Sequence, residues 1–214
     1  MKLLKELLEE LDLLESPQRI AALRLHQLED IKQNKKLTKL ITLWTPNAKV
    51  LETLAGDVKL YHQIKGKENE IYAIDEESKQ ILYFVRYEIQ SASFIDTDWV
   101  TQVLVWRGTF LSYKTKGLAE YIFNKYVLPI TGTVVSDGEQ TTDGERFWKQ
   151  RISDSFANHN LKIYLLNFND KTVVKFKNLN DYQVLLNTRN DPWGSRAYNK
   201  GVRIAISNHD FTQE

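Results

Sequence analysis

The sequence predicts an α/β fold of the α+β type, in which a mixed, mostly antiparallel sheet is flanked by helices and preceded by a helical N-terminal arm. Three patterns support this: leucines at helical spacing open the chain, strand-like alternation follows, and helix and strand patterns then alternate. With 214 residues, 42% of them hydrophobic, the chain can bury one sizeable core. We expect an arm over residues 1–36, a main domain over 37–186, and a tail over 187–214 that packs on the domain.

The arm is predicted from leucines that recur every three or four residues, while lysine and glutamate fill the positions between them. Ser16 and Pro17 indicate the end of one helix and the start of a second, because serine caps helices and proline is tolerated at the first helical position. Two interpretations stay open here: a pair of helices that pack on the domain, or an arm that docks on a partner protein.

The middle of the chain alternates β-branched and aromatic residues, which predicts successive strands. Short polar connectors at residues 66–69 and 75–79 favour an antiparallel meander. Residues 47–54 are expected to form a short helix before it. The expected strands cover residues 37–44, 58–65, 70–74, 80–91 and 99–107.

After Arg107 the pattern predicts a helix over residues 115–128 ended by Pro129, and a strand over 132–136. A helix over 143–158 and a strand over 161–168 follow. A strand, a crossover helix and another apolar strand are typical of parallel pairing, so the sheet should be mixed. A hairpin partner is expected at 171–177 and an edge-like strand at 202–206.

Composition excludes several classes of function. The chain has no cysteine, which excludes disulfides, thiolate metal sites and a cysteine nucleophile. A net charge of +1 disfavours nucleic acid as a partner. Apolar runs fall short of the roughly 20 residues that span a membrane, and no secretory signal is evident, so we expect no membrane partner and a cytoplasmic location. The histidines are scattered singly, which disfavours a metal site: His26, His62, His159 and His209.

The best candidate site is the turn between the predicted strand 99–107 and the predicted helix after it. Its residues are Lys114, Thr115, Lys116, Gly117, Leu118 and Ala119. The start of a helix presents unpaired N–H groups and a positive dipole end, and small residues allow a phosphate to approach the backbone. The alternative is that Gly117 only permits a tight turn and that both lysines are solvated.

The order of elements and this turn together resemble the GNAT family of acyl-CoA-dependent N-acyltransferases. The family signature is glutamine or arginine, two residues, glycine, one residue, then glycine or alanine. Lys114 stands at the first of these positions, Gly117 at the second and Ala119 at the third. The resemblance covers about residues 58–168, roughly half of the chain.

The resemblance implies an acyl-CoA co-substrate, most simply acetyl-CoA, and an amine acceptor that attacks its thioester directly. The pyrophosphate would sit on the N–H groups of residues 116–119. The pantetheine arm would pair with the backbone of Val103, Leu104 and Val105, where this strand splays from the strand at 132–136.

The acid–base groups are less well defined by the sequence. Asp137 or Glu139 is the candidate base that deprotonates the amine; the alternative for this loop is an Asx turn with a helix cap. Family members commonly place a tyrosine on the second crossover helix as the general acid, but residues 147–158 hold Phe156 and no tyrosine. Candidate substitutes, left unranked, are Tyr113, Tyr121 and Tyr164.

Residues 136–148 and the leucine-rich opening are also similar to GNAT-like proteins of tailed bacteriophages. In some such phages a comparable leader ending in glutamate, here Glu15, directs a protein into the capsid. Two functions therefore stay open: an N-acyltransferase in the cytoplasm, or a GNAT-like phage protein of the host cytoplasm or virion that has lost catalysis and serves a structural or host-interaction role.

Overall fold

The structure is a computed structural model of the chain. It describes residues 48–65, 68–107, 112–138, 142–158, 160–187, 192–193 and 201–211. The expected arm over 1–36 and the expected strand over 37–44 lie outside the described residues.

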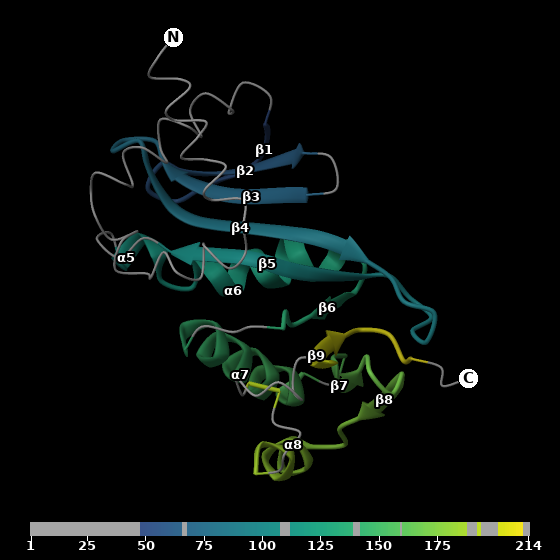
Figure 1. Ribbon diagram of the computed structural model, residues 1–214. Helices are drawn as coiled ribbons and strands as arrows, with labels where there is room; N and C mark the ends of the chain where they lie inside the picture. The colour runs from purple at the N-terminus through teal and green to yellow at the C-terminus, as the bar shows by residue number, and fades with distance from the viewer. Residues whose placement is uncertain are drawn as a thin grey trace. The chain divides into compact units, whose positions relative to one another are not determined.

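The elements follow the order shown in Figure 1. The strands are β1 Lys49–Leu54, β2 Val58–Lys65, β3 Glu68–Asp75, β4 Gln80–Gln90, β5 Trp99–Arg107, β6 Thr133–Val135, β7 Lys162–Asn167, β8 Thr172–Lys175 and β9 Val202–Ser207. The helices are α5 Ser112–Thr115, α6 Leu118–Ile122, α7 Thr142–Ala157 and α8 Leu179–Leu186. A π-helical turn Phe123–Val127 and a 3₁₀ turn Leu128–Ile130 continue α6.

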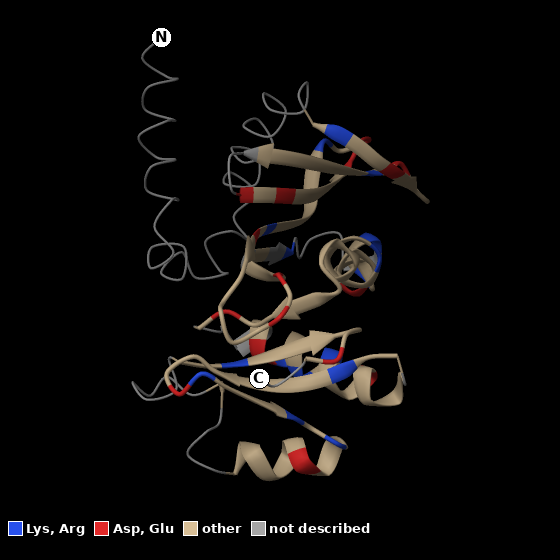
Figure 2. Ribbon diagram, turned by 90° about the vertical axis from the view of Figure 1, so that its right-hand side faces the viewer, with Lys and Arg blue, Asp and Glu red and all other residues tan. Residues whose placement is uncertain are grey.

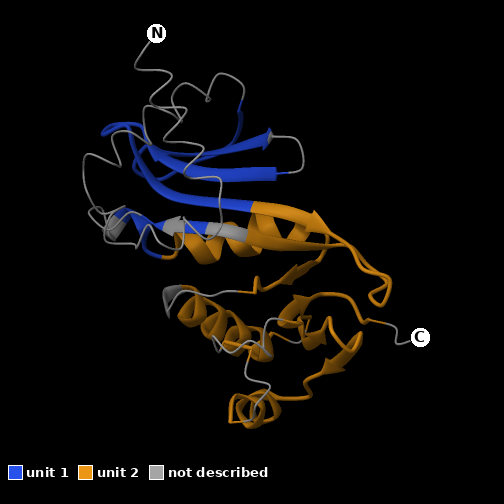
Figure 3. Ribbon diagram, viewed as in Figure 1, with its two compact units in different colours: residues 1–86, 103–116 blue, residues 87–102, 117–214 orange. Residues whose placement is uncertain are grey.

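The fold is α+β, with a large, mixed and mostly antiparallel sheet, as the sequence predicts. Its strand order is β1-β2-β3-β4-β5-β6-β9-β7-β8. The chain divides into two compact units, residues 1–86 with 103–116, and residues 87–102 with 117–214 (Figure 3). Basic and acidic residues are interspersed along the strands and helices of each unit (Figure 2).

The first unit is built on the predicted meander. β2 and β3 pair antiparallel over their whole length, from Val58 with Asp75 to Lys65 with Glu68. Their inward face holds a cluster of buried apolar residues, and the rings of Tyr61 and Tyr72 stack at 5.4 Å between centroids. The remaining members of this cluster are Ile74, Ile81 and Phe84.

The helix expected over residues 47–54 is wrong, because this segment forms strand β1. It pairs antiparallel with β2, ending with Leu54 opposite Val58. Gly56 and Asp57 both adopt positive φ, at 71° and 61°, and so reverse the chain tightly enough to bring the segment against β2. Pairing with a neighbouring strand therefore outweighs the local helical preference.

The second unit places β9 between β6 and β7, so the expectation of an edge-like strand at 202–206 is wrong. β9 pairs antiparallel with both neighbours, through Ile206 opposite Val134 and Ile206 opposite Ile163. Three consecutive residues of β9, from Ile204 to Ile206, are fully buried. The sequence predicts an edge strand here because the segment follows a turn-rich stretch and has no strand neighbour close to it in sequence.

The core of the second unit lies on both faces of these strands. One face carries Trp99, Val135, Tyr164 and Leu166 in a single buried cluster. On α7, Trp148 and Ile152 are buried, and the Trp148 ring meets Phe123 edge to face at 6.2 Å. α7 packs on β7 (Figure 1).

Helix α8 was not expected from the sequence. The Asn178 side chain accepts a hydrogen bond from the Asp181 N–H at 3.1 Å, and Asp181 in turn accepts one from the Lys177 N–H at 3.0 Å. The arrangement resembles a capping box, except that the acid accepts from the N–H of Lys177, the residue before the N-cap Asn178. An asparagine followed three residues later by an acid is therefore the sequence signal that identifies the start of this helix.

Candidate functional site

The predicted turn over residues 114–119 does not lead directly from a strand into a helix. A short helix comes first, and a glycine separates it from the next helix. Lys114 and Thr115 already belong to the short helix α5, and α6 starts only at Leu118. Gly117 separates them with φ 75° and ψ −8°, a left-handed conformation that side chains disfavour. A helix running unbroken from Thr115 is therefore ruled out by the backbone at Gly117.

The residues of the turn differ in exposure. Thr115 and Leu118 are buried, whereas Lys116 and Gly117 are exposed and Ala119 is half-buried. The Tyr121 N–H donates to the Gly117 carbonyl at 2.9 Å, which fixes the first turn of α6. A Cβ added to Gly117 would meet nothing within 4 Å, so the space beside this glycine is open.

Lys114 is engaged within the first unit. Its ammonium group donates to Asp75 Oδ1 at 2.8 Å, and the two side chains are 13% and 2% exposed. Burial alone raises the pKa of the Asp75 carboxyl, but hydrogen bonds from Lys114 and Ser78 outweigh burial and hold the pKa below its ordinary value. The ammonium group is therefore occupied by a carboxylate of its own unit, a partner 39 positions away that no local sequence pattern indicates.

The strands on either side of the crossover pair parallel for only a short distance. The register joins Val100 with Val134 and Thr101 with Val135. The next amide, that of Ser136, donates to the Ile204 carbonyl on β9 at 2.8 Å, and the Ser136 hydroxyl accepts from the Ile204 N–H at 3.1 Å. β6 pairs with β9 from Thr133 onward and this pairing continues at Ser136, whereas the recorded pairs with β5 end at Val135, and β5 itself continues to Arg107.

The strand residues assigned to the pantetheine arm lie in this continuation of β5. Val103, Leu104 and Val105 are all extended, and the Val105 side chain is exposed. Sequence reasoning placed these three residues in a strand correctly. It did not single out the residue before them, Gln102, a polar side chain that is buried within this strand.

The acidic loop after β6 is described only in part. Asp137 is half-buried directly after Ser136, and Gly138 lies against Arg203 of β9, since a Cβ on that glycine would come 2.3 Å from the guanidinium. Glu139 lies outside the described residues, and Asp143, the helix cap of the alternative interpretation, is already the second residue of α7. Asp137 therefore stays the candidate base that can be placed.

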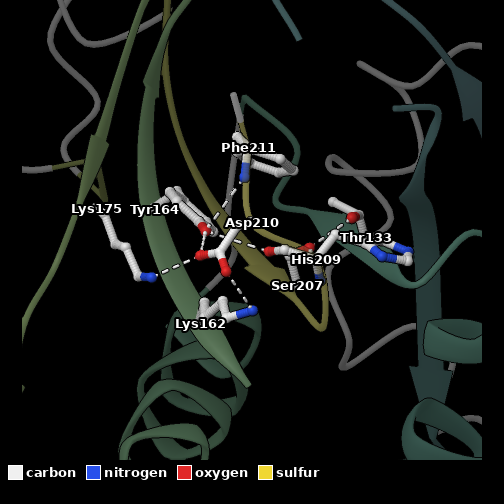
Figure 4. Close-up of polar contacts among 8 residues, drawn as sticks. All are labelled: Thr133, Lys162, Tyr164, Lys175, Ser207, His209, Asp210 and Phe211. Carbon is white, nitrogen blue, oxygen red and sulfur yellow. Dashed lines mark hydrogen bonds and ion pairs between the residues drawn. The ribbon is translucent and has the colours of Figure 1, made fainter. Parts of the chain in front are cut away.

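Tyr164, one of the substitute acids, takes part in a polar cluster that ties the segment after β9 to β7 and β8 (Figure 4). Its hydroxyl donates to the His209 carbonyl or to Asp210, each at 3.2 Å, and accepts from the Phe211 N–H. Burial, then the nearby acid, raises the pKa of Tyr164 to about 12. The hydroxyl is thus occupied by its own fold, which favours a structural role.

Asp210 completes this cluster by joining two lysines. Its carboxylate oxygens accept from Lys175 at 2.6 Å and from Lys162 at 2.9 Å, and these hydrogen bonds hold the pKa of Asp210 far below its ordinary value. Figure 4 shows both ammonium groups pointing at this one carboxylate. Lys162, Lys175 and Asp210 therefore form a clasp on the outer strands of the unit.

A second clasp holds the crossover helices together. The Arg151 guanidinium on α7 binds Glu120 on α6 at 2.9 Å and Asp154 at 2.7 Å. The hydrogen bond from Arg151 lowers the pKa of Glu120. A polar cavity of about 400 Å³ lies beside these three residues, and Asn124 and Asn158 also line it.

No group of three or more potential metal ligands occurs among the residues that the structure describes. Within the same residues, every helix is too short or too polar to cross a bilayer. Comparisons of the chain with protein-family models, curated proteins and solved structures found no match.

Proposed function

We propose that this chain is an acyl-CoA-dependent N-acyltransferase of the GNAT type, most simply an N-acetyltransferase. The observation that carries the proposal is the short parallel pair of β5 and β6, joined by a crossover that starts at the left-handed Gly117. A strand that continues beyond its partner offers backbone amides and carbonyls to an extended ligand, which can bind as an added strand. The pantetheine arm of CoA is extended and contains two amides.

In this proposal the co-substrate binds largely through the backbone. The N–H groups of residues 116–119 face the pyrophosphate, and Gly117 leaves room for it because its Cα carries no side chain. Val103, Leu104 and Val105 pair with the pantetheine arm. Lys116, which is exposed, supplies positive charge beside the pyrophosphate.

The reaction needs no covalent intermediate on the protein, which suits a chain without cysteine. The amine nitrogen attacks the thioester carbonyl carbon, the new C–N bond forms and the C–S bond breaks. The amine proton passes to a base, for which Asp137 is the candidate, and the departing CoA thiolate takes up a proton from solvent or a side chain. The acceptor is any amine that reaches the carboxyl end of β6.

The proposal is tested by titrating acetyl-CoA into the protein in a calorimeter, followed by an acetyl-transfer assay on a panel of amines. Released CoA can be read with a thiol reagent, since the protein contributes no thiol. We expect one binding site in the wild type and an affinity loss of at least about tenfold in Gly117→Glu, because the new carboxylate opposes the diphosphate. Absence of binding at roughly millimolar acetyl-CoA would refute the proposal.

Gly56→Glu is the matched control for this variant. Gly56 also has positive φ, 71° against 75°, and a Cβ there likewise meets nothing within 4 Å. Both variants should therefore lose similar stability through backbone strain. Only Gly117→Glu should lose acetyl-CoA binding.

The second candidate function is a GNAT-like phage protein without catalysis, in a structural or host-interaction role. Two observations favour it: residues 142–157 of α7 contain no tyrosine, and the Tyr164 hydroxyl is already hydrogen-bonded within the fold. Acetyl-CoA binding without transfer to any amine would support this candidate, whereas transfer abolished by Gly117→Glu would exclude it.

A further inference from the structure

Gln102 on β5 is a buried amide without a hydrogen-bond partner. The residue is 5% exposed, and neither its side-chain oxygen nor its nitrogen bonds to any residue that the structure describes. Buried polar groups in folded proteins are nearly always paired, and each one left unpaired destabilises the fold. A side chain that leaves both a donor and an acceptor unused therefore calls for a functional explanation.

The position of Gln102 supplies one. It is the next residue after Thr101, where the parallel register with β6 ends. Side chains alternate along a strand, so Gln102 shares the face of Val100, which is fully buried, and not that of Thr101, which bonds to the Trp99 indole at 3.2 Å. The unused amide thus stands directly after the last recorded pair of β5 with β6, on a strand that continues beyond it to Arg107.

We propose that Gln102 recognises the pantetheine arm of the acyl-CoA by pairing its side-chain amide with an amide of the arm. This inference rests on the proposed function. An amide offers one N–H and one C=O, the complement of the two unused atoms of Gln102. Both atoms are covered in the free protein, so binding includes a local displacement of the side chains above them.

The experiment compares Gln102→Met with the wild type in two measurements, thermal unfolding without ligand and calorimetric titration with acetyl-CoA and with pantetheine. Methionine keeps the length of glutamine and removes both polar atoms. We expect the melting temperature of the free protein to rise by about 2–4 °C, because an unpaired buried amide is removed. We expect the affinity for acetyl-CoA and for pantetheine to fall about tenfold, because the variant cannot form either hydrogen bond.

Gln63→Met is the matched control. The Gln63 side-chain oxygen on β2 is likewise buried without a partner, but β2 has no place in the proposed site. This control should gain stability and bind acetyl-CoA as the wild type does. Gln102→Leu provides a second variant with the same expectations in case Gln102→Met does not fold.

The results distinguish a failure of the role of Gln102 from a failure of the proposed function on which that role rests. If the wild type does not bind acetyl-CoA, the proposed function fails first. If the wild type binds and Gln102→Met binds equally well, only the role of Gln102 is overturned. A fall in the melting temperature of Gln102→Met would also overturn it, because the amide would then have a structural partner in the free protein.

Discussion

Replacing Lys114 with methionine separates the role suggested by sequence from the role suggested by structure. The sequence places Lys114 in the candidate phosphate turn, whereas the fold pairs its ammonium group with Asp75 at 2.8 Å. Loss of one partner of a buried ion pair costs about 3–5 kcal/mol, because the remaining charge stays desolvated. Ser78 keeps donating to Asp75 at 2.5 Å, so we expect the lower value, about 3 kcal/mol.

Urea unfolding, monitored by tryptophan fluorescence, measures this loss in the free energy of unfolding. A loss of this size corresponds to a fall of about 6–12 °C in melting temperature for a chain of this length. Adding Asp75→Asn to Lys114→Met should restore most of the stability, because no uncompensated charge then remains. The pKa of Asp75 is lowered in the folded state, so the ion pair stabilises the protein above the ordinary carboxyl pKa of 3.8. The stability gap between the wild type and the double variant should therefore narrow as pH falls through the folded pKa.

Two results would refute this reasoning. Unchanged stability in Lys114→Met would show that the pair with Asp75 does not form in solution. A well-folded double variant that no longer binds acetyl-CoA would show that Lys114 contributes to the candidate phosphate turn in which the sequence places it.

Two further predictions concern the second unit. Asn178→Ala should destabilise the protein by about 1 kcal/mol through loss of the helix cap on Asp181, as measured by urea unfolding, whereas Asn178→Ser should retain the cap and most of the stability. Asp210→Asn should release the clasp with Lys162 and Lys175, so that limited proteolysis cuts after β9 sooner than in the wild type. Because the pKa of Asp210 is lowered, wild-type protection should persist at neutral pH and disappear in acid; equal cutting rates at neutral pH would contradict the clasp.

Local patterns in the sequence were sufficient to predict most strands. The expected boundaries of β2 and β5 agree with the structure, because both strands are rich in β-branched and aromatic residues and are bounded by polar turns. The parallel crossover was also predicted, and the pairing of Val100 with Val134 confirms it. Such features depend on neighbours in the chain, which a sequence displays directly.

The features that were missed depend on distant partners. Asp75 and Lys114 meet across 39 positions, and the burial of Gln102 depends on packing against elements that are distant in sequence. Neither has a local signature. Gly117 was assigned to the turn correctly, but the short helix before it was not expected, since four residues of helix carry no periodic signal.

The place of β9 has a consequence for how the second unit is assembled during synthesis. Until residues 202–207 leave the ribosome, β6 and β7 each lack the neighbour that finally joins them, and each presents an unsatisfied strand edge. β6 and β7 can be joined only when β9, the most C-terminal of the described strands, inserts between them, so this part of the sheet forms after both of its neighbours have been translated. Late closure of this kind favours slow folding and leaves a window in which chaperones can act or strands can be exchanged between chains.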